Sequence, residues 1–191
     1  MYPQVPQCEN LEVRPISREA DIAWLAGIID GEGNLHACVQ EKKSGDGRLK
    51  FLCPKVRITN TDVRMIKKVS EIYVKENLTF FYALNRVSRY KNKKDTWRDQ
   101  LEITIGSQNG VAKLLKLVIP YLVNKQTYAS IFLETIKWVM LQPKRGRMSV
   151  ETESYIDQPE FSVFMQRLAD ERANFVEPST TTRKAGVSLV I

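Results

Sequence analysis

The sequence predicts an α+β fold in which helices cover one face of an antiparallel sheet. Two observations lead to this fold class. The segments read in order as helix, two strands, helix, two strands and two helices, with a further helix near the C-terminal end. Hydrophobic residues make up 43% of the 191 residues and charged residues 27%, which is a globular composition and excludes disorder along the whole chain.

The first helix is predicted from its cap and its apolar spacing. Ser17 is a good N-cap, and two acidic residues lie in the first turn, where the helix dipole favours negative charge. Apolar residues then recur at helical spacing, at Ile22, Leu25, Ile28 and Ile29. Gly31 or Gly33 is expected to end the helix. The proline-containing residues 1–16 are interpreted as an N-terminal arm.

Two strand-like segments follow the helix. Apolar and polar residues alternate over residues 34–40, which predicts a strand with one face toward a core. Residues 41–48 are predicted to form a polar hairpin loop before a second strand at 48–59. Pro54 inside that strand indicates an edge position or a bulge. Asp62 is expected to cap the next helix.

Two further strands and three further helices are predicted in the second half of the chain. Its predicted strands are residues 78–88 and 97–105, joined by a basic loop, and its predicted helices are residues 108–118, 126–141 and 159–175. The predicted organisation is one domain over residues 17–142, a C-terminal helical extension over 143–178 and a mobile tail over 179–191.

Composition restricts the chemistry that the chain can carry. Lys and Arg total 29 and Asp and Glu total 22, and the resulting net charge of +7 suggests a polyanionic partner such as nucleic acid. With no long apolar run and no signal-peptide pattern, a soluble, intracellular protein without a membrane segment is expected. The three cysteines, Cys8, Cys38 and Cys53, are an odd number without CxxC spacing. This pattern argues against a disulfide framework and against a cysteine zinc site. His36 is the single histidine, so a metal would be held by oxygen.

One face of the predicted sheet has no helix to cover it. Its side chains are polar and varied: Asn34, His36, Gln40, Arg57, Gln100, Glu102 and Thr104. Such a face can simply be solvated. In a strongly basic chain it can also lie in the major groove of DNA, and both readings stay open.

The end of the first helix carries the informative pattern. Ala23, Gly27 and Gly31 are four residues apart and lie on one face, where small side chains let another helix approach closely. Because the pattern occurs once, the natural partner is the same helix of a second copy, on a two-fold axis. Asp30 and Glu32 stand at the negative end of the helix dipole, so a compensating cation such as Mg²⁺ is expected there.

The segment Trp24–Gly33 resembles the LAGLIDADG homing endonucleases, in their single-motif, homodimeric branch. Five residues match the family letters, namely Leu25, Ala26, Gly27, Asp30 and Gly33, and four are familiar variants, namely Ile28, Ile29, Gly31 and Glu32. Through the order of elements the resemblance extends over residues 18–140. It implies an αββαββα core with a saddle-shaped, DNA-binding antiparallel sheet backed by helices.

The resemblance also implies site residues. Glu32 takes the place of the metal-binding, catalytic acid and Gly31 lends its carbonyl to the metal, expected as Mg²⁺, with Mn²⁺ or Ca²⁺ able to occupy the same sites. Asp30 is interpreted as structural, bonding to nearby backbone. Asn60 either organises water near the cleaved phosphate or is a helix N-cap or turn residue. Lys125 either stabilises the transition state or is a surface lysine at a helix start.

The implied reaction is a staggered double-strand break, in which two chains cut opposite strands by attack of activated water. The sheet would read the bases. The candidate DNA-binding residues are Asn34, His36, Cys38, Gln40, Lys42, Lys55, Arg57, Asn85, Arg89, Gln100, Glu102 and Thr104. Asn85 and Arg89 join this set if Tyr82 and Leu84 face the core. Lys91, Lys93, Lys94 and Arg98 are expected to hold phosphates or to be solvated.

Two alternatives to a site-specific double-strand DNA endonuclease stay open. One is an intron RNA maturase that assists splicing, and the other is a DNA-binding regulator that does not cleave. An acidic residue at position 32 favours cleavage. The host compartment is open between an organelle, chloroplast or mitochondrion, and a prokaryotic or phage-infected cytoplasm.

Overall fold

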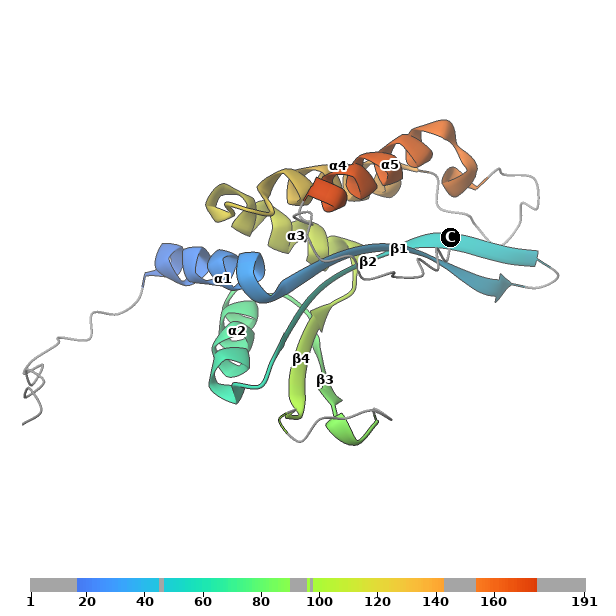
Figure 1. Ribbon diagram of the computed structural model, residues 1–191. Coiled ribbons are helices and arrows are strands. Elements are labelled where there is room, and N and C mark those ends of the chain that lie inside the picture. Colours follow the sequence, from blue (N-terminus) through green and yellow to red (C-terminus); the bar gives the residue numbers. More distant parts are fainter. Residues whose placement is uncertain (1–16, 45–46, 90–95, 97, 143–153, 175–191) are drawn as a thin grey trace, which may run out of the picture.

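The computed structural model describes residues 17–44, 47–89, 96, 98–142 and 154–174 (Figure 1). The helices are α1 (Arg18–Glu32), α2 (Val63–Lys75), α3 (Gln108–Val118), α4 (Gln126–Leu141) and α5 (Pro159–Asn174), with short 3-10 turns at η1 (Val87–Arg89), η2 (Ile119–Tyr121) and η3 (Tyr155–Asp157). The strands are β1 (Gly33–Ser44), β2 (Gly47–Asn60), β3 (Phe81–Asn85) and β4 (Gln100–Ile105). The predicted N-terminal arm, the linker after residue 142 and the C-terminal tail lie outside the described residues.

The helix boundaries follow the local capping signals. Ser17 Oγ accepts the backbone N–H of Ala20 at 3.1 Å, and Asp62 Oδ1 accepts that of Arg64 at 2.9 Å. Both predicted N-caps are therefore confirmed. The predicted bounds of α3 and α4 are confirmed as well; Ser107 caps α3 through its side chain, whereas no side chain caps α4.

The four strands form one antiparallel sheet in the order β1-β2-β4-β3. The loop predicted at residues 41–48 is wrong over most of its length, because β1 continues to Ser44 and β2 already begins at Gly47. Backbone pairing continues there between polar residues. The two later strands are shorter than predicted, since β3 and β4 pair only from Phe81 opposite Thr104 to Asn85 opposite Gln100.

The prediction that Pro54 lies at a strand edge is confirmed. β2 pairs with β4 only from Val56 to Asn60, so Pro54 has β1 on one side and, among the described residues, no strand on the other. Side chains cover this free edge. The N–H of Leu52 donates to the Tyr155 hydroxyl at 2.7 Å, and its carbonyl accepts from Gln108 Nε2 at 3.3 Å. These contacts protect the edge from pairing with another chain.

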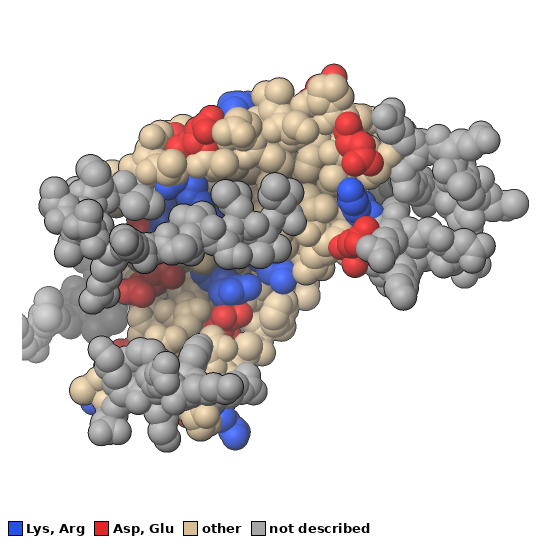
Figure 2. Space-filling model, turned by 45° about the vertical axis from the view of Figure 1, so that its right-hand side comes forward, with Lys and Arg blue, Asp and Glu red and all other residues tan. Residues whose placement is uncertain are grey.

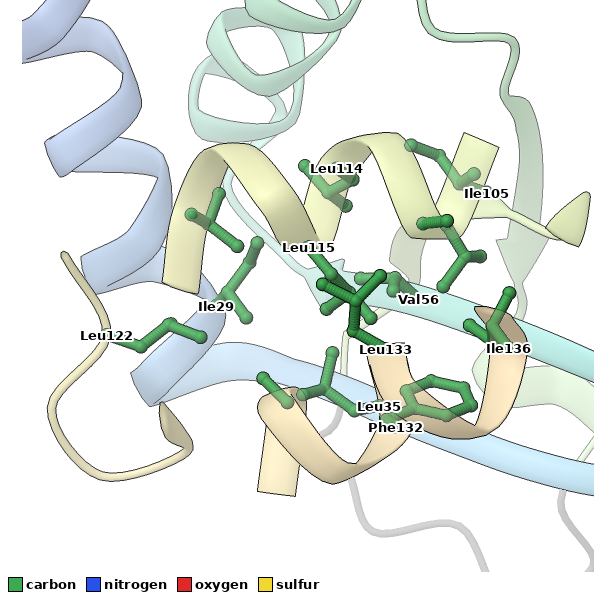
Figure 3. Packing of buried hydrophobic residues seen from close by; sticks show 14 of the residues in the cluster. Ile29, Leu35, Val56, Ile105, Leu114, Leu115, Leu122, Phe132, Leu133 and Ile136 are labelled. Carbon is green, nitrogen blue, oxygen red and sulfur yellow. The ribbon is translucent and has the colours of Figure 1, made fainter. Parts of the chain in front are cut away.

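The hydrophobic core lies between the sheet and the helices. All five helices and the strands β1, β2 and β4 contribute to it, as the packing of Ile29, Leu35, Val56, Ile105, Leu115 and Phe132 illustrates (Figure 3). In Figure 1 the helices lie on one side of the curved sheet, and no helix of the described chain covers the opposite face. The α+β fold class predicted from the sequence is thereby confirmed.

The C-terminal helix belongs to this core. Phe161 and Leu168 of α5 are each only 3% exposed, and the ring of Trp138 on α4 packs against Phe161 and Phe164. α5 therefore packs along α4 as part of the same body. Among the described residues, no helix combines the length and the apolar content needed to cross a lipid bilayer.

A buried carboxylate ties α1 to α2, and its titration should be visible in stability. Asp21 is 3% exposed and ion-pairs with Lys68 at 2.7 Å and with Lys75 at 2.9 Å. The hydrogen bonds from Lys68 and then Lys75 lower the pKa of Asp21 below its ordinary 3.8. The stabilisation is therefore complete above that ordinary value and is lost as pH falls through the lowered pKa.

We expect Asp21→Asn to lower the free energy of unfolding at pH 7 by roughly 1–3 kcal/mol, since two ammonium groups lose their counter-charge. Thermal unfolding followed by circular dichroism should show this difference shrinking below about pH 4. A difference that stays constant down to pH 2 would contradict the assignment.

Candidate active site and nucleic-acid interface

The C-terminal end of α1 is held by a reciprocal set of hydrogen bonds with the start of α4. Asp30 Oδ2 accepts the backbone N–H groups of Val123 at 2.6 Å and Asn124 at 3.3 Å, and Oδ1 accepts that of Lys125 at 3.0 Å. The structural role predicted for Asp30, bonding to nearby backbone, is confirmed. Both of its oxygens are used in this way.

Lys125 completes the arrangement from the other side. Its ammonium group donates to the carbonyls of Ile29 at 2.7 Å, Asp30 at 2.7 Å and Gly33 at 2.8 Å. Its three hydrogens are therefore all engaged, and its charge lies at the negative end of the α1 dipole. Burial lowers the pKa of Lys125, although Asp30 and Glu32 act in the opposite direction.

Sequence reasoning missed this capping role of Lys125. Two acidic residues and no basic residue occupy the last turn of α1, which indicates that a cation must come from elsewhere. The sequence pointed to a divalent ion. The structure provides Lys125, which is more than ninety residues away along the chain and could not be assigned to this end from local pattern.

Glu32 is the last residue of α1 and is exposed. No hydrogen bond or ion pair links its carboxylate to another described residue. Lys125 also does not bond the carbonyl of Gly31. These two oxygen groups suit a hard divalent cation that keeps several of its waters. The described part of the chain has no cluster of three or more His, Cys, Asp and Glu side chains, so one chain does not build a closed metal cage.

Gly33 is fixed by sterics at the junction of α1 and β1. A Cβ at this position would lie 2.6 Å from the carbonyl oxygen and 2.7 Å from the Cα of Ile29. The glycine therefore lets the chain leave the helix close to its last turn, beside Glu32. A sequence pattern that predicts a glycine stop does not reveal which backbone atoms require it.

We expect Gly33→Ala to lower the free energy of unfolding by about 1–3 kcal/mol, because backbone must move to admit the methyl group. Gly106→Ala is the matched control. Its Cβ would meet only the Phe81 ring at 3.6 Å, an ordinary contact, and a change within about 0.5 kcal/mol is expected. Urea unfolding of both variants measures the difference, and equal stabilities would refute the steric argument.

The small-residue stripe of α1 faces outward. Ala23, Gly27 and Gly31 are all exposed, and a Cβ added at either glycine meets no atom within 4 Å. Neither glycine has a positive φ. Nothing in the described chain therefore requires glycine at these positions, although glycine within a helix lowers its stability by about 1 kcal/mol.

Asn60 lies at the end of β2, directly before the cap of α2. Its Oδ1 accepts the backbone N–H of Asp62 at 2.8 Å, which is an Asx turn. It is paired with Leu101, on the helix-covered side of the sheet, whereas Arg57 and Thr59 point to the open face. Of the two roles considered for Asn60, the turn is the one with a contact in the structure.

The register places the candidate DNA-binding residues on one face of the sheet. Opposite pairs share a face, and these pairs are Asn34–Arg57, His36–Lys55, Cys38–Cys53, Arg57–Thr104 and Asn85–Gln100. Tyr82 and Leu84 pair with Ile103 and Leu101 and so point to the opposite side. The side chains of Lys42 and Arg89, and residues Lys91, Lys93 and Lys94, lie outside the described part of the chain.

Glu102 is the centre of a hydrogen-bonded group on this face. Its carboxylate lies 3.2 Å from Arg57 Nε and accepts from Thr104 Oγ1 at 3.0 Å and Asn85 Nδ2 at 3.3 Å. Thr104 is 1% exposed, so its hydroxyl supports Glu102 from beneath. Three strands thus hold Arg57 and Glu102 in fixed positions on the open face.

The remaining polar side chains of the face differ in exposure. Asn34, Gln40 and Gln100 are exposed, whereas His36 and Lys55 are half-buried. Figure 2 shows basic side chains in the central recess of this side of the molecule, with acidic ones beside them. The face therefore offers donors and acceptors of both signs, as base edges require.

Two side chains of the face are held neutral. Burial, followed by the charges of Arg172, Arg57 and Lys55, lowers the pKa of His36. Burial also raises the pKa of Cys38, whose thiol donates to the carbonyl of Cys53 at 3.2 Å. At neutral pH, His36 is therefore an uncharged imidazole and Cys38 a thiol.

No protein-family model matches the sequence, and no curated protein matches it. Among solved structures, the chain is similar to the homing endonuclease I-CvuI in complex with the I-CreI target (C1221) in the presence of 2 mM Mg, with DNA not cleaved; the identity is 16%, the TM-score 0.53, and the alignment covers 86% of this chain and 87% of that one. I-CvuI in complex with its target (Sro1.3) in the presence of 2 mM Ca gives 16% identity and a TM-score of 0.52, over 87% and 88%.

The meganuclease I-SmaMI, bound to uncleaveable DNA with a TTCT central four, is similar with 14% identity and a TM-score of 0.51. That alignment covers 82% of this chain but only 45% of I-SmaMI, so the chain spans less than half the length of that protein. At these identities the likeness shows the fold.

Proposed function

The chain has the fold of the LAGLIDADG homing endonucleases, and from this premise we propose that it is a member of that family. Its activity is proposed to be site-specific cleavage of double-stranded DNA by a homodimer. Solved structures with this fold are described in complex with DNA targets, which supports DNA as the partner.

The observation that carries the proposal is the end of α1. An exposed carboxylate, Glu32, stands beside an outward-facing glycine stripe and at the edge of an uncovered polar sheet face. The surrounding bonds of Asp30 and Lys125 fix the backbone at this point. A carboxylate held in place but left without a protein partner is suited to bind a ligand.

Glu32 and the carbonyl of Gly31 would hold a divalent cation, Mg²⁺ in the proposed reaction, with Mn²⁺ or Ca²⁺ as possible occupants. When bound, the ion supplies positive charge that stabilises the negative charge developing on the phosphate and makes water a better nucleophile. The chain's own contribution is to position Glu32. Lys125 does so by holding the last carbonyls of α1 together. Its charge would lie next to the reacting phosphate in the proposed complex.

Two copies of the chain are proposed to meet along Ala23, Gly27 and Gly31. The close approach that these residues allow would bring both Glu32 carboxylates to one axis, where each serves one DNA strand. Cleavage of both strands of a pseudo-palindromic target follows from this symmetry. Asn60, whose Oδ1 is used in a turn, has no part in the chemistry of this proposal.

The open face would read the target sequence. Arg57 is suited to guanine and Glu102 to the amino group of cytosine, while Asn34, Gln40 and Gln100 suit adenine edges. His36, Cys38, Lys55 and Asn85 complete the described part of the proposed contact surface. Their fixed positions on paired strands favour base recognition over contacts with phosphate alone.

The test is a cleavage assay on a library of randomised duplexes, with Mg²⁺ and with EDTA. Cuts in both strands at one pseudo-palindromic site, present with Mg²⁺ and absent with EDTA, are the expected result. Enrichment of one sequence without any cut would support a DNA-binding regulator instead. If the assay yields no cuts and no enriched sequence, the proposal is contradicted. Binding of the host intron RNA would then be measured.

A further inference from the structure

α5 runs antiparallel to α4 and returns toward the end of α1. Along the helix pair, Trp138 packs on Phe164 with ring centroids 5.8 Å apart, and Arg167 ion-pairs with Glu134 at 3.1 Å. The same register brings Arg172, in the last turn of α5, to the first turn of α4, where its charge acts on Tyr128. Arg172 of the C-terminal helix therefore lies near the end of α1, where Glu32 is located.

Arg172 lines a pocket of about 210 Å³ at the junction of α1 and β1. The other lining residues are Gly33, Asn34, Leu35, Lys125 and Tyr128. The polar side chains are those of an amide, an ammonium, a phenol and a guanidinium, and no carboxylate of a described residue is among them. Gly33, which follows Glu32 directly in the chain, lines the pocket, so a group bound in it would lie near the proposed site of cleavage.

Two of these donors have no partner within the described part of the chain. Tyr128 is 6% exposed, and its hydroxyl bonds no other described group. Burial raises the pKa of Tyr128, so the hydroxyl keeps its proton at neutral pH and can donate it. Arg172 has no ion pair with any described carboxylate, although Arg167 on the same helix has one.

We infer that this pocket binds a phosphate group of the DNA backbone next to the cleaved bond, through Arg172 and Tyr128. The inference rests on the proposed function and extends it to the C-terminal helix. A guanidinium binds phosphate with two parallel hydrogen bonds, and a buried phenol adds a third donor. The competing explanation is that Arg172 only offsets the dipole at the end of α5.

The experiment compares Arg172→Gln, Arg172→Lys and Tyr128→Phe with the control Arg167→Gln, which removes an exposed arginine from the same helix. Binding is measured with Ca²⁺ in place of Mg²⁺, at several KCl concentrations, on the duplex recovered from the library by the wild-type protein. Thermal unfolding is recorded for every variant.

We expect Arg172→Gln to weaken binding roughly tenfold to a hundredfold and to reduce the slope of log affinity against log salt by about 0.9 per chain. Arg172→Lys should keep the slope but recover only part of the affinity, because the ammonium lacks the planar fork. Tyr128→Phe should weaken binding by less than Arg172→Gln and leave the slope unchanged. Arg167→Gln should match the wild type.

A lowered melting temperature in Arg172→Gln with wild-type affinity and slope would overturn the inference and assign Arg172 to the helix dipole. Equal effects of Arg172→Gln and Arg167→Gln would overturn it as well. In both cases the wild-type protein still binds and cuts, so the proposed function stands. A wild-type protein that binds no duplex would remove the proposed function and the inference together.

Discussion

Glu32→Gln is expected to abolish DNA cleavage while DNA binding persists. The amide has the shape of the carboxylate but no charge, so it binds a divalent cation poorly. Since Glu32 has no bond to another described residue, its replacement should leave the fold intact. We expect the cleavage rate on the recovered duplex to fall by roughly a hundredfold to a thousandfold or more.

Glu160→Gln is the control for this prediction, because Glu160 is an exposed acidic residue in the first turn of α5, outside the proposed site. It should cut at the wild-type rate. Single-turnover cleavage and gel-shift binding with Ca²⁺ measure the two properties separately. Cleavage that survives in Glu32→Gln would show that another group holds the metal.

Gly27→Leu is expected to prevent the proposed pairing of two chains and thereby to remove cleavage. A leucine on the outward stripe of α1 has free space in the single chain, where a Cβ at Gly27 meets no atom within 4 Å. Leucine also favours the helix by up to about 1 kcal/mol over glycine. The single chain should therefore stay folded, while a second helix can no longer approach closely.

Sedimentation equilibrium should give the mass of one chain for Gly27→Leu and of two for the wild type. Glu71→Leu adds a leucine to an exposed position of α2 and controls for added apolar surface. It should remain a dimer and cut DNA. A dimeric, active Gly27→Leu would exclude the stripe of α1 as the contact between chains.

The sequence predicted best what depends on nearby residues. Ser17 and Asp62 mark their helices because a cap bonds to a backbone group two or three residues away. The length of β3 depends on where β4 stops pairing with it, which no local pattern encodes. The polar ends of β1 and β2 read as a loop because they bury little apolar surface, yet their backbones still pair.

The candidate site shows the same division. The alternation of side chains along β1, β2 and β4 was sufficient to predict that Asn34, Arg57 and Glu102 lie on one face of the sheet. What each side chain touches could not be predicted in this way. Lys125 bonds two carbonyls of α1 and that of Gly33 at the start of β1, and Arg172 reaches the same region only because α5 folds back along α4.

The β1–β2 hairpin extends well beyond the point where β4 ends. From Gly47 to Lys55, β1 is the only strand of the described chain that pairs with β2, whereas Val56 to Asn60 are enclosed between two strands. For anyone redesigning the target sequence, the two zones call for different strategies. On the outer ribbon, Gln40 is exposed and can be exchanged by itself. Arg57 and Glu102 share bonds and need to be varied together with Asn85 and Thr104, as a single unit of a combinatorial library.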